Sequence, residues 1–428
     1  MITPRLSLGR AHLLAVSAIR EARRLGLPAD ALAPIGDIRR YAPEVERVSL
    51  LAIASADRHA AILNGFRTLP IVTEATDQSP SSVTASTSRG SLTLHVASPQ
   101  HAGTALVRHT GSARHLDQLD ARAAARGLRF VDGRLQRDEG TALECPTESD
   151  VYHHLDLPLI APELREGRDE IAAAERGELP HLISDLHIRG DLHMHSDWSD
   201  GRDTIEYMVY ASRQLGYEYV AITDHSERSW ASRKLAADDV PKQREQVEAL
   251  RSRMRGIEIL HGVEVDIMKD GTLDFSDDLL AGFDIVLASL HDHGGDDGAR
   301  LTERYLRAID HPLVNVITHP ANRSPGQSPG YDVDFDRLFS AAAETGTAME
   351  VDGAPGHLDL DGTLARRAVA AGVTIVIDSD CHRAEALGRQ MKFGIGTARR
   401  GWVEPRHVLN ARPVDQVREF IVKKRARR

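Results

Sequence analysis

Two histidines and an aspartate stand close together in the stretch "GDLHMHSDWSDG", residues 190–201. His193 and His195 are two residues apart, and Asp200 follows five residues after the second histidine. Alternate side chains of a strand point to the same face, so both imidazoles can contact one ion. A polar turn would use the same residue types, and this stretch alone fits either interpretation.

Later short apolar runs are followed by more residues of the same chemistry, at His225, Glu264, His291, His319, Asp380 and His382. Singly, each of these histidines would be interpreted as a hydrogen-bonded core residue. With the first three residues they make six histidines, two aspartates and one glutamate. So many unpaired ionisable groups are expensive to pack together unless cations neutralise them. The pattern therefore predicts a site for divalent metal ions.

Seven short apolar runs must position these residues, and each run ends in acidic residues or histidine. They are "DLHMH", "YVAITDH", "IEILHGVEVD", "DIVLASLH", "VNVITHP", "TAMEVDG" and "TIVIDSDCH". One polar residue at the end of each run serves as a marker. The successive markers are 32, 39, 27, 28, 33 and 28 residues apart, and they are His193, His225, Glu264, His291, His319, Asp352 and Asp380. Steps of this length fit one strand and one helix each, so we expect an α/β fold with a parallel (β/α)7-type barrel. Reactive side chains of such barrels lie at the C-terminal ends of the strands, where these residues fall.

The same residues resemble a known family pattern, that of the polymerase-and-histidinol-phosphatase (PHP) domain. Its motifs HxH, Asp, DH, Glu, SxH, HP and DxH are filled at all nine positions. The whole chain resembles the C-terminal three quarters of the bacterial family X DNA polymerases that carry a PHP domain. "LIAPELREGRDEIAAAERGELPHLI" and "GIGTARRGWVEPRHVLN" resemble that family in particular. The resemblance implies a metal-dependent phosphoesterase in which water activated by two to three ions, Mn²⁺ or Zn²⁺, attacks phosphorus.

The resemblance also implies which residues hold each ion. The three sets are His193, His195, Glu264 and Asp380; Glu264, His291 and His319; and Asp200, His225 and His382. Asp380 and Arg323 would belong to the catalytic centre, with Arg323 binding the substrate phosphate through its guanidinium fork. Arg323 has an alternative as a surface arginine. Asp191 either orients a ligand histidine or ends a strand, and we expect Cys381 to be a buried space-filling residue.

The N-terminal half resembles the polymerase part of that family, but without its metal-binding aspartates. The aspartate pair falls on Arg47 and Ser49, and the third aspartate falls on Thr93. Without these carboxylates the two Mg²⁺ ions of nucleotidyl transfer have no ligands. Arg39–Arg40 and the turn at residues 110–112 remain as groups that can contact phosphates. We therefore expect a degenerate α+β polymerase-like domain at residues 1–158, a linker at 159–189 and the PHP domain at 190–428.

Composition narrows the class of protein. The 428 residues carry a net charge of −10, which argues against a protein that coats nucleic acid, and only 4% are aromatic, which argues against an extended base-stacking surface. No apolar run approaches the length of a membrane span. The two cysteines are far apart, which fits a cytoplasmic protein. The Ser- and Thr-rich segment at residues 77–90 is expected to be a mobile loop.

The function that these features favour is phosphoester hydrolysis at DNA ends, as a 3′–5′ exonuclease or 3′-phosphatase without polymerase activity. DNA ends or single strands are the expected partners. One alternative is a phosphatase for a small phosphoester such as histidinol phosphate, which needs the same chemistry. Another is a DNA-end binding protein whose metals are structural, although a purely structural site needs no such open cluster.

Overall fold

The computed structural model describes residues 5–426, and contacts within it divide the chain into two compact units between Leu179 and Pro180. The division falls inside the predicted linker, and Arg165, in the first part of that linker, is fully buried in the first unit. The outermost residues of the predicted domains 1–158 and 190–428 lie outside the described residues. The assignment of these ranges as domains stays a prediction.

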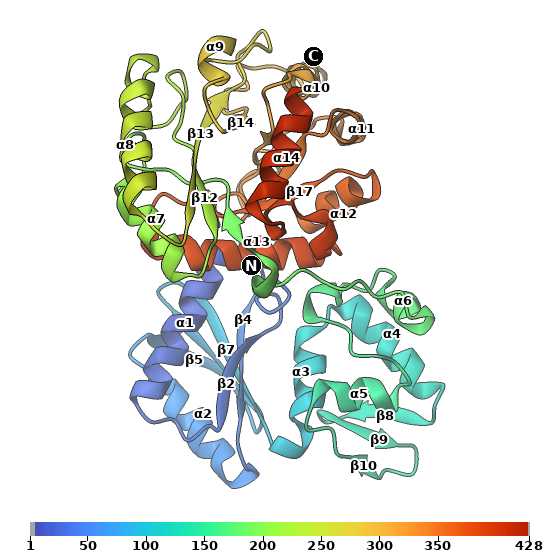
Figure 1. The fold of residues 1–428 in the computed structure, drawn as a ribbon. Helices are drawn as coiled ribbons and strands as arrows, with labels where there is room; N and C mark the ends of the chain where they lie inside the picture. Colours follow the sequence, from blue (N-terminus) through green and yellow to red (C-terminus); the bar gives the residue numbers. More distant parts are fainter. Residues whose placement is uncertain (1–4, 427–428) are drawn as a thin grey trace. The chain divides into compact units, whose positions relative to one another are not determined.

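The first unit contains a five-stranded sheet in the order β2-β4-β7-β6-β5. Its strands are β2 (Ala31–Ile35), β4 (Val48–Ile53), β5 (Val72–Ser79), β6 (Ser82–Thr87) and β7 (Gly90–Ala97). Strands β4 and β7 pair in parallel, and the other neighbours pair antiparallel. Helices α1 (Leu8–Arg24) and α2 (His59–Arg67) contact this sheet (Figure 1). A two-stranded ribbon joins β1 (Leu6–Ser7) to β3 (Glu44–Val45).

The rest of the first unit is mainly helical. It consists of α3 (Ala102–Thr110), α4 (Ala113–Ala124), α5 (Glu148–His154) and α6 (Glu170–Arg176), with an antiparallel sheet of β8 (Leu128–Val131), β9 (Arg134–Arg137) and β10 (Ala142–Leu143). Two of these helices begin with side-chain caps: Ser112 caps α4, and a capping box of Thr147 and Asp150 starts α5.

The prediction of a mobile loop at residues 77–90 is wrong. This segment forms most of a hairpin, in which β6 lies between β5 and β7. Its Thr and Val residues are β-branched and alternate with small residues, which suits a pleated strand. Val83 and Ala85 are buried on one face of β6. The Ser and Thr content is therefore explained by a half-buried strand.

The second unit is built on the seven predicted strands, which pair in sequence order and all in parallel. They are β11 (Gly190–Asp191), β12 (Tyr219–Ile222), β13 (Glu258–Asp266), β14 (Ile285–Ser289), β15 (Val316–Ile317), β16 (Ala348–Asp352) and β17 (Ile375–Asp378). Beyond β11 and β17 a bridge joins Met194 to Cys381, and the N–H of His195 donates to the Cys381 carbonyl at 2.9 Å. The barrel is therefore nearly closed, and the predicted fold class is confirmed.

Helices surround these strands (Figure 1). They are α7 (Ile205–Gln214), α8 (Val240–Arg253), α9 (Asp277–Leu280), α10 (Gly298–Asp310), α11 (Phe335–Thr345), α12 (Gly362–Ala370), α13 (Leu387–Arg400) and α14 (Val414–Arg425). Within residues 5–426, every helix is too short or too polar to cross a membrane.

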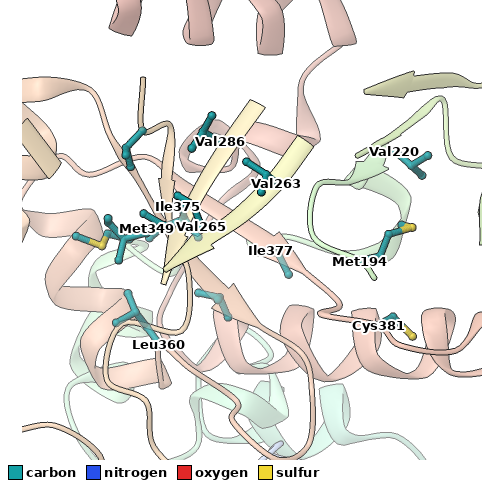
Figure 2. Packing of buried hydrophobic residues seen from close by; sticks show 14 of the residues in the cluster. Met194, Val220, Val263, Val265, Val286, Met349, Leu360, Ile375, Ile377 and Cys381 are labelled. Atoms are coloured by element: carbon teal, nitrogen blue, oxygen red, sulfur yellow. The ribbon is translucent and has the colours of Figure 1, made fainter. Parts of the chain in front are cut away.

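The apolar core of the barrel follows the two-residue period of the strands. Val220, Val263 and Ile377 belong to a large buried cluster, part of which Figure 2 shows together with Met194 and Cys381. Alternate positions such as Leu260 form a second cluster with α14 residues. Glu264 lies four residues beyond Leu260, on the same face of β13. The face that is apolar at the start of the strand thus carries a carboxylate near its C-terminal end.

Candidate metal centre

All nine predicted ligands lie in one connected cluster at the C-terminal ends of the barrel strands. Glu264 is at its centre and is fully buried. Its Oε2 lies 2.7 Å from Nδ1 of His225 and 3.5 Å from Nε2 of His193. Its Oε1 lies 2.9 Å from Nε2 of His319 and 3.8 Å from Nε2 of His291. A single carboxylate therefore faces histidines from four separate strand ends.

Two further carboxylates connect the remaining residues. Asp380 Oδ1 lies 3.1 Å from Nε2 of His195 and 3.7 Å from Nδ1 of His382. Asp200 Oδ1 lies 3.2 Å from Nε2 of His382 and 3.5 Å from Nε2 of His225. Side chains that follow β11, β12 and β17 therefore converge on the same buried carboxylates.

The arrangement contains several groups of donor atoms small enough to surround an ion. Within each group the atoms lie within 4.8 Å of one another: His195, Asp200, His225 and His382; His193, His195 and Asp380; and His225, Glu264 and His291. Nitrogen and carboxylate oxygen bind Zn²⁺ at about 2.0–2.2 Å, which places neighbouring ligands a little over 3 Å apart. The spacings therefore fit metal coordination.

Unsatisfied atoms support the same fit. Among the described residues, buried atoms without a hydrogen-bond partner include Nδ1 of His225, Oε2 of Glu264 and Oδ1 of Asp200. The first two are only 2.7 Å apart and still do not form a hydrogen bond. Buried polar atoms in native proteins nearly always have partners, so these atoms call for one. Divalent cations would satisfy them.

Contacts between histidines and carboxylates shift the pKa values of both kinds of group in the cluster. Burial by itself lowers the pKa of His193, but Glu350, Glu264 and Asp380 outweigh burial and raise that pKa well above its usual value. Burial raises the pKa of Glu264, but His225 and His193 outweigh it and hold the pKa well below the usual range. The central carboxylate is therefore ionised.

Two carboxylates outside the nine orient ligand histidines, and sequence reasoning missed both. Glu350 Oε1 accepts from Nδ1 of His193 at 2.6 Å, while its Oε2 accepts the backbone N–H of His319 at 2.7 Å. Asp266 Oδ1 lies 3.0 Å from Nδ1 of His291. Each contact directs the opposite ring nitrogen, Nε2, toward Glu264, and such contacts fix the tautomer that a metal ligand needs.

The structure separates the alternatives that the sequence left open for Asp191. Its Oδ1 accepts the backbone N–H groups of His193 at 3.3 Å and Ser379 at 3.2 Å. Asp191 therefore ends β11 and ties two strand ends together, and it does not contact an imidazole in these hydrogen bonds. The turn that carries Asp200 is held by Asp224, which accepts from the backbone and side chain of both Ser196 and Ser199.

Cys381 is buried, as expected, and its Sγ contacts the carbonyl of Arg383 at 2.9 Å and Oε1 of Gln390 at 2.7 Å. Burial raises the pKa of the Cys381 thiol to about 12. Because metals bind the thiolate, a neutral thiol with two acceptors is a poor ligand. Cys381 acts as a packing residue between Asp380 and His382.

Arg323 lies beyond the end of β15, four residues after His319. Its side chain is only 12% exposed, and its Nη1 contacts Oδ2 of Asp361 at 3.0 Å. Nε of Arg323 is buried without a hydrogen-bond partner. A freely solvated surface arginine does not fit this environment. A further group of donor atoms within 4.8 Å of one another consists of Asp352, His357 and Asp380, and of these His357 is the residue that the sequence analysis did not single out.

Backbone conformation is unusual at two of the predicted ligands. His319 has φ of 27° and Asp380 has φ of 46°. Residues other than glycine adopt positive φ at a cost of about 1–3 kcal/mol, and such residues concentrate at functional sites. The turns that aim these side chains into the cluster are therefore maintained by the surrounding contacts.

In the first unit, the positions aligned with polymerase aspartates come together. Ser49 of β4 pairs directly with Thr93 of β7, and Thr93 is buried with its hydroxyl 3.0 Å from that of Thr84. Arg47 lies just before β4 and contributes to lowering the pKa of His95, after burial and His109. The positions expected to carry the polymerase aspartates therefore hold two neutral hydroxyl groups, of Ser49 and Thr93, and the cation of Arg47.

The two arginines expected to contact phosphates already have carboxylate partners. Arg39 donates to Oε1 and Oε2 of Glu148, at 2.7 and 2.5 Å. Arg40 donates to Glu166 at 3.0 Å and to Asp37 at 2.5 Å. The ion pairs with Glu148 and Glu166 connect the turn that follows β2 to α5 and to the segment before α6. Both arginines therefore have a structural role.

Two segments of the chain match known protein families. Residues 105–166 match the DNA polymerase beta thumb, and residues 191–321 match the PHP domain. The chain is 39% identical over 319 residues, 74% of its length, to a DNA polymerase/3′-5′ exonuclease PolX of Bacillus subtilis, and it spans 55% of that relative.

Shorter relatives match about half of the chain. A probable phosphatase of Thermoanaerobacter sp. is 29% identical over 246 residues, 55% of this chain and 95% of the relative. A probable phosphatase of Shewanella oneidensis is 31% identical over 210 residues, 46% of this chain and 78% of the relative. The chain therefore belongs to the PHP family of phosphoester hydrolases, and it combines the PHP domain with a thumb of the DNA polymerase beta type.

Proposed function

We propose that this phosphoester hydrolase acts on DNA ends, as a 3′–5′ exonuclease or 3′-phosphatase, and that it does not extend primers. The observation that carries the hydrolytic part is the buried cluster of histidines around Glu264. The preference for DNA is supported by the match of residues 105–166 to a polymerase thumb and by the similarity to the DNA polymerase/3′-5′ exonuclease of Bacillus subtilis.

The proposed ligands are the nine residues predicted from the sequence: His193, His195, Asp200, His225, Glu264, His291, His319, Asp380 and His382. Divalent ions held by them would neutralise phosphate oxygens and lower the pKa of water at the site. Glu350 and Asp266 would keep ligand nitrogens aimed inward. Mixed nitrogen and oxygen ligands suit both Mn²⁺ and Zn²⁺, and we propose two to three ions.

Arg323 is proposed to bind the substrate phosphate. A guanidinium group matches phosphate oxygens bidentately, and four residues of extended chain keep its Cα within about 14 Å of that of His319. Its partner Asp361 holds one side of the guanidinium through Nη1, and the buried Nε has no hydrogen-bond partner. In this role Arg323 orients the phosphorus for attack and balances its charge.

Loss of polymerase activity follows from the paired strands β4 and β7. Nucleotidyl transfer needs carboxylates to hold two Mg²⁺ ions, and the aligned positions are Arg47, Ser49 and Thr93. Arg47 adds positive charge where a cation would have to sit. The first unit would then serve substrate binding only.

The second candidate function is hydrolysis of a small phosphomonoester. It is favoured by the relatives named probable phosphatases, which the chain covers over 95% and 78% of their length. The test is a side-by-side assay with Mn²⁺ on labelled single-stranded DNA and on histidinol phosphate. Faster turnover of the DNA supports the proposal, and hydrolysis of histidinol phosphate alone would replace it with the phosphatase.

A further inference from the structure

One large aromatic side chain is exposed near the metal centre. Trp230 is 69% exposed, the highest value for any aromatic residue among the large exposed hydrophobic side chains of the described residues. It lies in the loop at residues 226–235, which leads from β12 toward α8 (Figure 1). A single exposed apolar side chain is common on protein surfaces, so the meaning of this indole depends on where it lies and on its neighbours.

Both ends of this loop are fixed at a proposed metal ligand. The loop starts directly after His225, and the N–H of Leu235 at its other end donates to the His225 carbonyl at 2.8 Å. Leu235 is buried and anchors the return. Five residues of extended chain reach at most about 18 Å, so the Trp230 Cα lies within that distance of the His225 Cα.

The loop is also tied to two neighbouring ligand segments. The N–H of Ser226 donates to the Glu264 carbonyl at 3.0 Å. Arg233 donates to the carbonyls of Gly201 at 2.7 Å and Asp197 at 3.3 Å, on both sides of Asp200. The N–H of Arg228 also donates to Oδ2 of Asp274 at 2.7 Å. The loop is therefore anchored at the rim of the candidate metal centre.

Charge around Trp230 differs from that of the surrounding unit. Residues 226–235 contain Arg228, Arg233 and Lys234 against Glu227, a net charge of 3 − 1 = +2, and Arg228 faces Asp274 at 3.5 Å. Residues 180–428 as a whole contain 32 basic and 40 acidic residues, a net charge of −8. An exposed aromatic ring among cations is the arrangement that proteins use to stack bases of single-stranded nucleic acid while attracting its phosphates.

We propose that Trp230 stacks on a nucleobase of a single-stranded DNA end and thereby holds the terminal phosphoester at the metal centre. This inference rests on the proposed function, because a small phosphomonoester has no base to stack. The low aromatic content of the chain is compatible with it, since one stacking position at the rim is enough to hold an end. Lys234 would contact a phosphate beside the stacked nucleotide, while Arg228 and Arg233 hold the loop in place.

The test combines removal of the indole with removal of the base. Wild type, Trp230→Ala and Trp230→Phe are compared, with Mn²⁺, on a labelled single-stranded oligonucleotide and on the same oligonucleotide whose 3′-terminal nucleotides lack bases. We expect Trp230→Ala to raise KM on the normal oligonucleotide about 5- to 150-fold, the range for loss of one base–aromatic stack. Trp230→Phe should keep much of the activity. On the base-free end, wild type and Trp230→Ala should be equally weak.

Trp402→Ala is the matched control. Trp402 precedes Val408, which pairs with Ile375 at the start of β17, so it lies near the opposite ends of the strands. Its loss should leave the ratio of the two substrates unchanged. Equal rates for wild type and Trp230→Ala on the normal oligonucleotide, or an equal loss on both oligonucleotides, would overturn the stacking role alone. If wild type shortens neither oligonucleotide but hydrolyses a phosphomonoester, the proposed function fails and stacking fails with it.

Discussion

Replacing Glu350 with glutamine tests whether the metal centre depends on the carboxylate that orients His193. Glu350 is fully buried and accepts two hydrogen bonds, from Nδ1 of His193 at 2.6 Å and from the N–H of His319 at 2.7 Å. Glutamine has the same shape but only one acceptor oxygen. In Glu350→Gln, one of the two donors must therefore face an NH₂ group.

The expected size of the effect follows from this mismatch. A buried donor left without an acceptor costs about 1–3 kcal/mol. The unpaired donor can be relieved in two ways. His193 can rotate, which turns Nε2 away from Glu264 and Asp380, or it can change tautomer, which places the ring proton on Nε2. Loss of a partner that orients a ligand histidine typically lowers metal affinity or activity about 10- to 100-fold. We expect Glu350→Gln to show a loss in that range.

The assay measures metal content by elemental analysis and DNA hydrolysis at several Mn²⁺ concentrations. Added Mn²⁺ should restore part of the lost activity, because the ligands themselves are intact. Glu344→Gln, a change at an exposed position of α11, is the control and should behave as wild type. Wild-type metal content and kinetics in Glu350→Gln would refute the orienting role of Glu350.

Three further outcomes are expected. Arg323→Ala should lower kcat/KM about 10- to 100-fold, the worth of a hydrogen bond to a charged group, without changing metal content, and wild-type kinetics would remove Arg323 from the site. Chelation followed by dialysis should abolish hydrolysis, and Mn²⁺ or Zn²⁺ should restore it; full activity in metal-free protein would contradict the metal mechanism. Burial lowers the pKa of His115 despite its 2.7 Å contact with Glu170, so the unfolded chain takes up that proton first as pH falls. The stability from neutral His115 should be complete above about pH 6.5 and decrease below it, and a thermal-unfolding difference between wild type and His115→Gln that is independent of pH would contradict this.

Much of the barrel could be predicted because its chemistry repeats along the chain. Seven apolar runs ended in histidine or acid at steps near one strand–helix unit, and all seven form paired strands. The gathering of the nine ionisable residues followed from the same repeat, since parallel strands end at one face of a barrel. Their role as metal ligands stays a proposal.

Residues that act through other residues were harder to predict. Glu350 lies inside the strand β16 and Asp266 at the end of β13, and a buried carboxylate within a strand gives no motif of its own. A usable signal was their parity: Asp266 is two residues after Glu264, and Glu350 is two before Asp352, so each faces the barrel interior. Glu148 and Glu166, which pair with Arg39 and Arg40, are more than 100 residues away, and no local pattern reveals such partners.

The hairpin at residues 72–87 shows the opposite error. Its Ser and Thr content was interpreted as a loop, although Thr is β-branched and favours strands. Pairing of β6 with β5 and β7 on its two sides supplies the hydrogen bonds that composition does not express.

The most direct test of the account is one gel with labelled primer–template, all four dNTPs and Mn²⁺, comparing wild type with Glu264→Gln. Glu264 faces the histidines of four strand ends, so the loss of its charge should disable the centre more than any other single change. The account predicts shorter products from wild type, none above background from Glu264→Gln, and longer products from neither. Longer products from wild type that Arg47→Glu or Thr93→Val removes, or shortening by Glu264→Gln at the wild-type rate, would contradict it.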